Sequence, residues 1–123
     1  MQIKEVSSMT GLSQDTLRYY EKEGLLAPVG KNASGIREYT EEDLRRVNFV
    51  KCMRAADVGV EVLKEFIGLY YEGEHTKPRR LEILMEQREQ LCMKLTKMQE
   101  ALQILDKKIG VYTAVFQDKN DSL

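Results

Sequence analysis

Apolar residues follow helical spacing over most of this chain. A stripe at positions i, i+3 and i+7 between Ile3 and Thr10 predicts a short first helix that Gly11 ends. Ser13 has the side chain of a helix N-cap, and a second helix is expected from there to Gly24, because glycine favours the left-handed backbone of a helix end. Only three residues, one of them glycine, separate the two helices, which is the spacing of a helix-turn-helix.

The helical period is lost over residues 28–39, which we call the wing. It is rich in glycine and polar residues and closes on an alternating Ile-Arg-Glu-Tyr stretch, so it predicts a short hairpin or an exposed loop. Residues 40–43 have the pattern of a capping box, with Asp in place of the usual Glu, and predict a third helix to about residue 56. A fourth helix is expected over 60–71, after a break that contains Asp57.

The C-terminal part of the chain carries a regular apolar seam. After a polar linker at 73–78, a helix is expected over 79–117, and residues 118–123 are expected to be disordered. The seam follows 3-4 spacing for four heptads and comprises Leu81, Leu84, Arg88, Leu91, Leu95, Met98, Leu102, Leu105 and Ile109. Because so long a helix cannot fold back along its whole length on so small a domain, a dimer interface is favoured over packing on its own domain. Arg88, the one charged member, is expected to set the register or to extend to solvent.

Composition narrows the function classes. The 123 residues are 42% hydrophobic and carry 19 basic against 20 acidic side chains, so the net charge of −1 gives no argument for a nucleic-acid partner. No apolar run is long enough to span a membrane and no signal-peptide core is present, so a cytoplasmic protein without a membrane partner is expected. With one histidine and two cysteines, neither a metal nor a cofactor is expected. Enzyme functions are disfavoured, a thiol enzyme using Cys52 and His75 being the weakest alternative.

The run TLRYYEKEGLL, which begins at Thr16, is the most informative in the chain. Helical spacing separates Leu17 and Tyr20 on one face from Arg18 and Lys22 on another. Arg18 can bind a phosphate oxygen or a guanine edge, and the neighbouring tyrosine can bring a hydroxyl to the DNA backbone. Two glutamates in the same helix weaken this interpretation. The residues alone therefore leave an ordinary amphipathic helix, with Tyr20 in the core, equally open.

This run, followed by a proline, a polar loop, the sequence GIREYTEEDL and the apolar FVKCMR, resembles the MerR family of bacterial transcriptional regulators. The resemblance extends from about Ile3 to Ile67, and the long heptad helix agrees with that family's dimerisation arm. It implies a mainly α fold, in which a winged helix-turn-helix DNA-binding domain with connecting helices (1–72) precedes an antiparallel coiled coil. It also implies a homodimer that binds and distorts a pseudo-palindromic promoter in double-stranded DNA, with RNA polymerase as a further partner.

The resemblance assigns DNA contacts to the second helix and to the wing. The expected contacts are Gln14, Thr16, Arg18, Tyr19, Tyr20 and Lys22 in the helix and Lys31, Ser34, Gly35, Arg37 and Tyr39 in the wing. Tyr39 is equally compatible with packing at the base of the wing. Since residues 1–54 hold nine basic and eight acidic side chains, any basic footprint must come from the placement of Arg18, Lys22, Lys31 and Arg37.

One thiol is the candidate sensor of the signal. The chain after residue 106 has neither Cys nor His, which disfavours the soft-metal site of metal-sensing relatives, and it is too short for a drug-binding domain. Cys52, in FVKCMR, resembles the cysteine of the short thiol-dependent branch, the NmlR- and AdhR-like regulators, which implies sensing of reactive aldehydes, nitrosothiols or oxidants. Three alternatives stay open: an inert buried Cys52, a different effector or none, and a coiled-coil interaction protein that has lost DNA binding. Cys92, beside the seam, is expected to pack.

Overall fold

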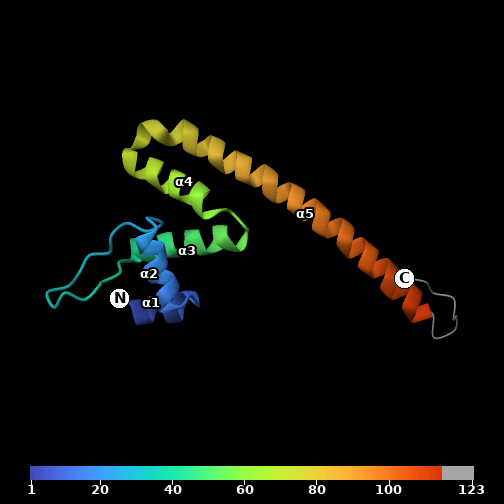
Figure 1. The fold of residues 1–123 in the computed structure, drawn as a ribbon, viewed down its shortest axis with the longest axis horizontal. Helices are drawn as coiled ribbons and strands as arrows, with labels where there is room; N and C mark the ends of the chain where they lie inside the picture. The colour runs from blue at the N-terminus through green and yellow to red at the C-terminus, as the bar shows by residue number, and fades with distance from the viewer. Residues whose placement is uncertain (115–123) are drawn as a thin grey trace. The chain divides into compact units, whose positions relative to one another are not determined.

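The computed structural model describes residues 1–114, which are mainly helical (Figure 1). The elements are α1 (Ile3–Thr10), α2 (Gln14–Lys22), α3 (Glu41–Ala55), α4 (Val60–Glu72), the 3-10 turn η1 (Glu74–Thr76) and α5 (Lys77–Ala114). The prediction of a mainly α fold is confirmed. Within the described range the wing forms no strands, and one isolated antiparallel bridge, between Lys31 and Arg37, stands where a short hairpin was one expectation.

The predicted signals at Gly11, Ser13 and Thr40 stand at helix ends in the structure. The Ser13 side chain accepts a hydrogen bond from the Thr16 backbone N–H at 3.0 Å and so caps α2. Gly11 ends α1 with a left-handed backbone at φ 76°, which glycine adopts without the cost a side chain would add. Thr40 and Asp43 form the expected reciprocal capping box at the start of α3. Local side-chain chemistry therefore sets where these helices begin and end.

The linker between α4 and α5 is shorter than predicted. Gly73 and η1 occupy four of the six positions expected to be irregular, and α5 begins at Lys77 in place of residue 79. Pro78 is accommodated in the first turn of α5, because the N–H that proline lacks has no partner in a helix at that position. The predicted helix end at 117 and the predicted disorder of 118–123 lie outside the described residues.

The chain divides into two compact units, one from Met1 to Leu84 and the other from Met85 onward. The first unit contains α1 to α4, η1 and the beginning of α5, and the second contains the rest of α5. All the candidate DNA-binding residues and Cys52 belong to the first unit. Most of the predicted seam belongs to the second.

The first unit has one hydrophobic core. Its buried members come from α1 to α4 and the segments between them, and are Val6, Leu17, Tyr20, Leu25, Leu26, Val29, Tyr39, Val47, Val50, Val58 and Leu63. Burying one large apolar side chain contributes about 1.5–3 kcal/mol, so this cluster is the main term that holds the short helices together. It fixes α2 by its inner face and leaves the opposite face of that helix in water.

Helix α5 exposes apolar side chains along its length. The eight apolar members of the seam are between 42% exposed (Leu84) and 68% exposed (Met98). Ile83, which was not assigned to the core, is buried. Within the described residues, no helix has the length and apolar character needed to cross a membrane.

Candidate nucleic-acid interface

Helix α2 presents a row of polar side chains to solvent. The Arg18 side chain is 49% exposed, forms an ion pair with Asp15 at 3.1 Å and donates to Gln14 Oε1 at 3.4 Å. The hydroxyl of Thr16 is hydrogen-bonded to that of Ser13 at 2.8 Å. An exposed ion pair contributes about 0–1 kcal/mol, so Arg18 can exchange its partners for a phosphate or a base edge at little cost. The expected contacts Gln14, Thr16 and Arg18 thus lie together at the start of α2.

The two tyrosines of α2 have opposite environments. Tyr19 is 46% exposed, and its ring centroid is 6.3 Å from that of Tyr20. Tyr20 is 6% exposed and belongs to the core with Leu17, three residues earlier on the same helix face. The expectation that the Tyr20 side chain contacts DNA is therefore corrected, and the alternative of a core residue holds. Lys22, in the last turn of α2, is exposed.

A tight turn shapes the tip of the wing. The side-chain oxygen of Asn32 accepts hydrogen bonds from the N–H groups of Ser34 at 2.9 Å and Ile36 at 3.1 Å. The Gly35 N–H donates to the Asn32 carbonyl, and Gly35 itself has φ 77°, where a side chain would be strained. Asn32 is not among the residues predicted for the site, although an Asn three residues before a Gly is a turn signal. The exposed tip presents Lys31, Ser34 and Gly35 to solvent.

An ion pair connects the wing to α2. Arg37 donates from Nε to Glu21 Oε2 at 2.9 Å, and the Glu21 side chain is mostly buried. Charge-assisted hydrogen bonds of this kind contribute about 1.5–3 kcal/mol. Because this bond uses only Nε of Arg37, the two other nitrogens of the guanidinium can donate to a phosphate. Sequence reasoning counted Glu21 only as unfavourable charge, since nothing in the pattern places it beside Arg37.

Tyr39 lies at the base of the wing and is 2% exposed. Its backbone N–H donates to the Met1 carbonyl at 2.6 Å, and its hydroxyl has no hydrogen-bond partner among the described residues. Burial raises the pKa of this hydroxyl, and the carboxylate of Glu21 adds to the rise. Of the two open roles, packing is the one the geometry supports. The expectation that Tyr39 contacts DNA is corrected accordingly.

Cys52 is exposed on α3, so it is not the inert buried thiol of the open alternative. The two basic residues nearest to it in sequence are engaged elsewhere. Lys51 Nζ donates to the Thr10 carbonyl, and Arg54 donates to the Val58 carbonyl at 2.7 Å. Cys92 is exposed on α5, where the single chain offers it no packing. Within residues 1–114, no three His, Cys, Asp or Glu side chains gather as the ligands of a metal ion.

Comparison with known proteins agrees with this geometry. Residues 1–68 match the model of the MerR HTH family of regulatory proteins. The transcriptional regulator AdhR of Bacillus subtilis (strain 168) is 45% identical over 91 residues, which are 74% of this chain and 65% of AdhR. The chain thus spans about two thirds of the length of that relative.

Two solved structures are also similar. The MerR family transcriptional regulator from Listeria monocytogenes has a TM-score of 0.90 and 44% identity, over 94% of this chain and 88% of that one. HiNmlR, a MerR family regulator that lacks the sensor domain and is bound to promoter DNA in its structure, has a TM-score of 0.84 and 26% identity, over 92% of this chain and 90% of that one. These relatives are transcriptional regulators and not enzymes. The chain therefore belongs to the MerR family of DNA-binding helix-turn-helix regulators.

Proposed function

We propose that this chain binds a pseudo-palindromic promoter as a homodimer, with α2 in the major groove and the wing on the adjacent phosphate backbone. The main support is the ion pair between Arg37 and Glu21, which holds the wing against α2. The polar side chains of α2 face solvent beside it. A helix beside an extended loop is the arrangement by which winged helix-turn-helix domains grip a duplex. The likeness to HiNmlR, whose structure holds promoter DNA, supports the same mode of binding.

Each contact in this proposal has a physical role. Arg18, Tyr19 and Gln14 lie where they can meet base edges or the backbone in the groove. Lys31, Ser34, Gly35 and Arg37 in the wing, with Lys22 at the end of α2, bind phosphates. Because residues 1–54 are close to neutral, two copies of the module are needed to give a strong electrostatic footprint.

The exposed seam of α5 supports the homodimer. An apolar stripe at 3-4 spacing on a helix is stable in water only when another helix covers it. In an antiparallel pair of α5 helices, the Ile109 end of one seam covers the Leu81 end of the other. The pair also places the two DNA-binding modules at a fixed separation. That separation sets the spacing of the half-sites in the DNA. We further propose that distortion of this DNA is what RNA polymerase responds to.

We assign the signal to Cys52, whose exposed thiol is accessible to a small electrophile. When an aldehyde is the signal, the sulfur forms a bond with the carbonyl carbon, the carbonyl π electrons move to the oxygen, and the proton that the thiol loses is transferred to that oxygen. The product is a hemithioacetal. The larger side chain then repacks the end of α3, close to the break before α4.

Selection of binding sites tests the DNA-binding part. Full-length protein is used to enrich duplexes from a random library, and the enriched duplex is titrated at several salt concentrations. An inverted repeat and an affinity that falls steeply with salt are expected. A library that shows no enrichment would leave a coiled-coil interaction protein as the better interpretation.

A reporter assay tests the sensor. The promoter found by selection is placed before a reporter, and cells with the wild type, Cys52→Ser or Cys92→Ser receive formaldehyde or a nitrosothiol. The Cys92→Ser protein is expected to respond like the wild type, and the Cys52→Ser protein is expected to bind the promoter but lose the response. A full response from Cys52→Ser would contradict the sensing role without affecting the DNA-binding proposal.

A further inference from the structure

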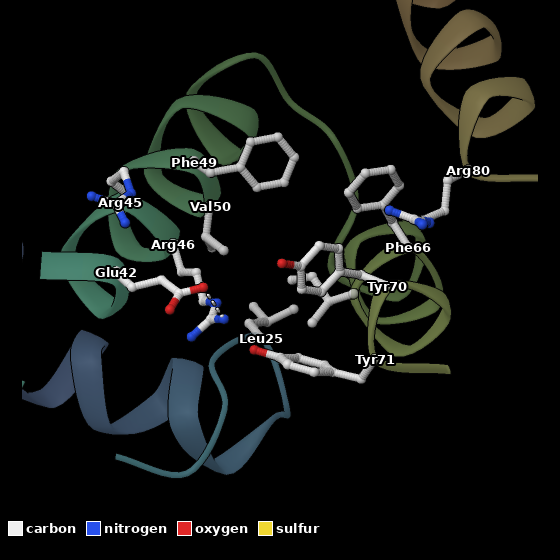
Figure 2. A pocket seen from close by; sticks show the side chains of 11 residues that line it. Leu25, Glu42, Arg45, Arg46, Phe49, Val50, Phe66, Tyr70, Tyr71 and Arg80 are labelled. Carbon is white, nitrogen blue, oxygen red and sulfur yellow. Dashed lines mark hydrogen bonds and ion pairs between the residues drawn. The ribbon is translucent and has the colours of Figure 1, made fainter. Parts of the chain in front are cut away.

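A cavity of about 380 Å³ lies in the first unit between α3 and α4 (Figure 2). Leu25 and Val50 form part of its apolar lining, and both are buried in the core. Phe49 of α3 and Phe66 of α4 pack on each other in its wall, with ring centroids 5.7 Å apart. Tyr70, from α4, directs its hydroxyl toward the interior (Figure 2). The volume falls within the range of about 300–1,000 Å³ that is usual for small-molecule sites.

The charged residues that line the cavity are three arginines and one glutamate, Arg45, Arg46, Arg80 and Glu42. Arg46 lies over the ring of Tyr71 at 5.5 Å and is paired with Glu42 at 2.7 Å. The positive charge of Arg46 is therefore largely compensated. The remaining charged residues of the lining, Arg45 and Arg80, are both positive.

Arg80, near the start of α5, is the lining cation best placed to bind an anion. It lies over the ring of Tyr70 at 5.3 Å. It donates from Nε to Thr76 Oγ1 at 3.0 Å and from Nη2 to the Gly73 carbonyl at 3.4 Å, and both of these acceptors are neutral. These two bonds orient the guanidinium without neutralising it. The nearby carboxylate of Glu74 also interacts with the charge of Arg80, but its ion-pair partner is Lys77, so Arg80 can still bind a carboxylate.

We propose that this cavity binds a small planar aromatic carboxylate. The aromatic body packs against the paired rings of Phe49 and Phe66 and against Tyr70, where apolar and aromatic surface is available from both helices. The carboxylate binds the guanidinium of Arg80. A neutral analogue gains only the stacking, and a cationic analogue meets an excess of positive charge.

The same cavity is placed to act as an effector site that is separate from Cys52, which does not line it. Its lining comes from α3, α4, the segment that holds Leu25, and Arg80 at the base of α5. A ligand there contacts α3, α4 and the beginning of α5 at once, and so biases how α3 and α4 pack. This regulatory consequence rests on the proposed DNA-binding function, whereas the binding of the ligand does not.

Binding of 2-naphthoate to the full-length protein, measured by calorimetry and by amide NMR shifts, tests the proposal. Saturable binding is expected, with the shifts concentrated in 42–50 and 66–71. The neutral 2-naphthamide should bind about tenfold more weakly, the size of one charge-assisted hydrogen bond. Arg80→Gln should reduce naphthoate affinity by a similar factor and leave the amide unchanged, which also shows that the cavity is still formed.

A matched control comes from the neighbouring residue. Arg79 forms ion pairs with Glu65 and Glu82 and does not line the cavity, so Arg79→Gln should bind naphthoate like the wild type. Three results would each contradict the site. They are an equal loss of naphthoate affinity in Arg79→Gln and Arg80→Gln, NMR shifts outside 42–50 and 66–71, and no naphthoate binding by protein that still binds DNA. Retained naphthoate binding by protein that fails to bind DNA would instead contradict only the proposed function.

Discussion

The α2–wing face and the α5 seam are both exposed, but their side chains meet water in opposite ways. On the α2–wing face, Arg18 and Arg37 already have acidic partners. Arg18 can exchange Asp15 for a phosphate at little cost, and Arg37 can bind a phosphate with the two nitrogens that Glu21 does not use. On the seam, the eight apolar side chains offer water no group that can donate or accept a strong hydrogen bond. The first surface is therefore stable alone and available to DNA, whereas the second is stable only when covered. The exposed polar face of α2 and the wing thus predicts DNA as a partner, and the exposed apolar seam predicts a second copy of α5.

The largest expected effect concerns the seam. Leu95→Glu with Leu102→Glu places two charges in the predicted dimer interface and removes two apolar side chains, which costs about 3 kcal/mol or more of dimerisation free energy. Sedimentation equilibrium is expected to find a dimer for the wild type and a monomer for the double variant. The exposed Gln99→Glu, off the seam, is the control and should remain dimeric. A double variant that still dimerises would place the interface elsewhere.

The next effect concerns the polar row of α2. Arg18→Ala is expected to weaken binding to the selected duplex by about 1–3 kcal/mol and to relax base preference, because a specific contact is lost. Lys4→Ala, exposed on α1 outside the predicted interface, should bind like the wild type. Titration of both variants by fluorescence anisotropy at fixed salt measures the difference. Equal affinities for wild type and Arg18→Ala would exclude Arg18 from the interface.

A smaller effect is expected from the link between the wing and α2. Glu21→Gln removes the charge that holds Arg37 in place, so the free energy of DNA binding should become less favourable by about 1 kcal/mol. This loss is expected even though the variant also removes a negative charge near the DNA. If Glu21 acted only as an unfavourable charge, the same variant would bind more tightly. The sign of the change in the dissociation constant decides between these two roles.

The smallest effect concerns Tyr39, whose buried hydroxyl has no partner among residues 1–114. Tyr39→Phe should change the free energy of unfolding by less than about 1 kcal/mol, because no hydrogen bond is lost. DNA affinity should be unchanged. A loss of affinity would restore the hydroxyl as a DNA contact.

The same variant has a pH signature. Burial and the Glu21 carboxylate raise the pKa of Tyr39 in the folded protein, so the folded state disfavours the phenolate. The stability due to this group is fully present below the unfolded pKa of about 10 and is lost as the pH rises through the higher folded value. Urea unfolding above pH 10 should therefore show a smaller loss of stability in Tyr39→Phe than in the wild type.

Sequence alone determined the local features of this protein. The cap at Ser13, the capping box at Thr40 and the 3-4 seam of α5 depend on residues within a few positions of one another. Such signals can be read along the chain because the interactions that produce them are local. The family resemblance in the RYYEKEGLL run rests on the same kind of continuous pattern.

Only the tertiary structure decided which side chains are available. Tyr20 and Tyr39 are buried, and Cys52 is exposed, although the sequence left each of these open. The bond between Glu21 and Arg37 joins residues sixteen positions apart, and the cavity brings together Leu25 and Arg80. No spacing rule relates such residues, because packing of separate segments on the shared core, and not the local backbone, brings them together.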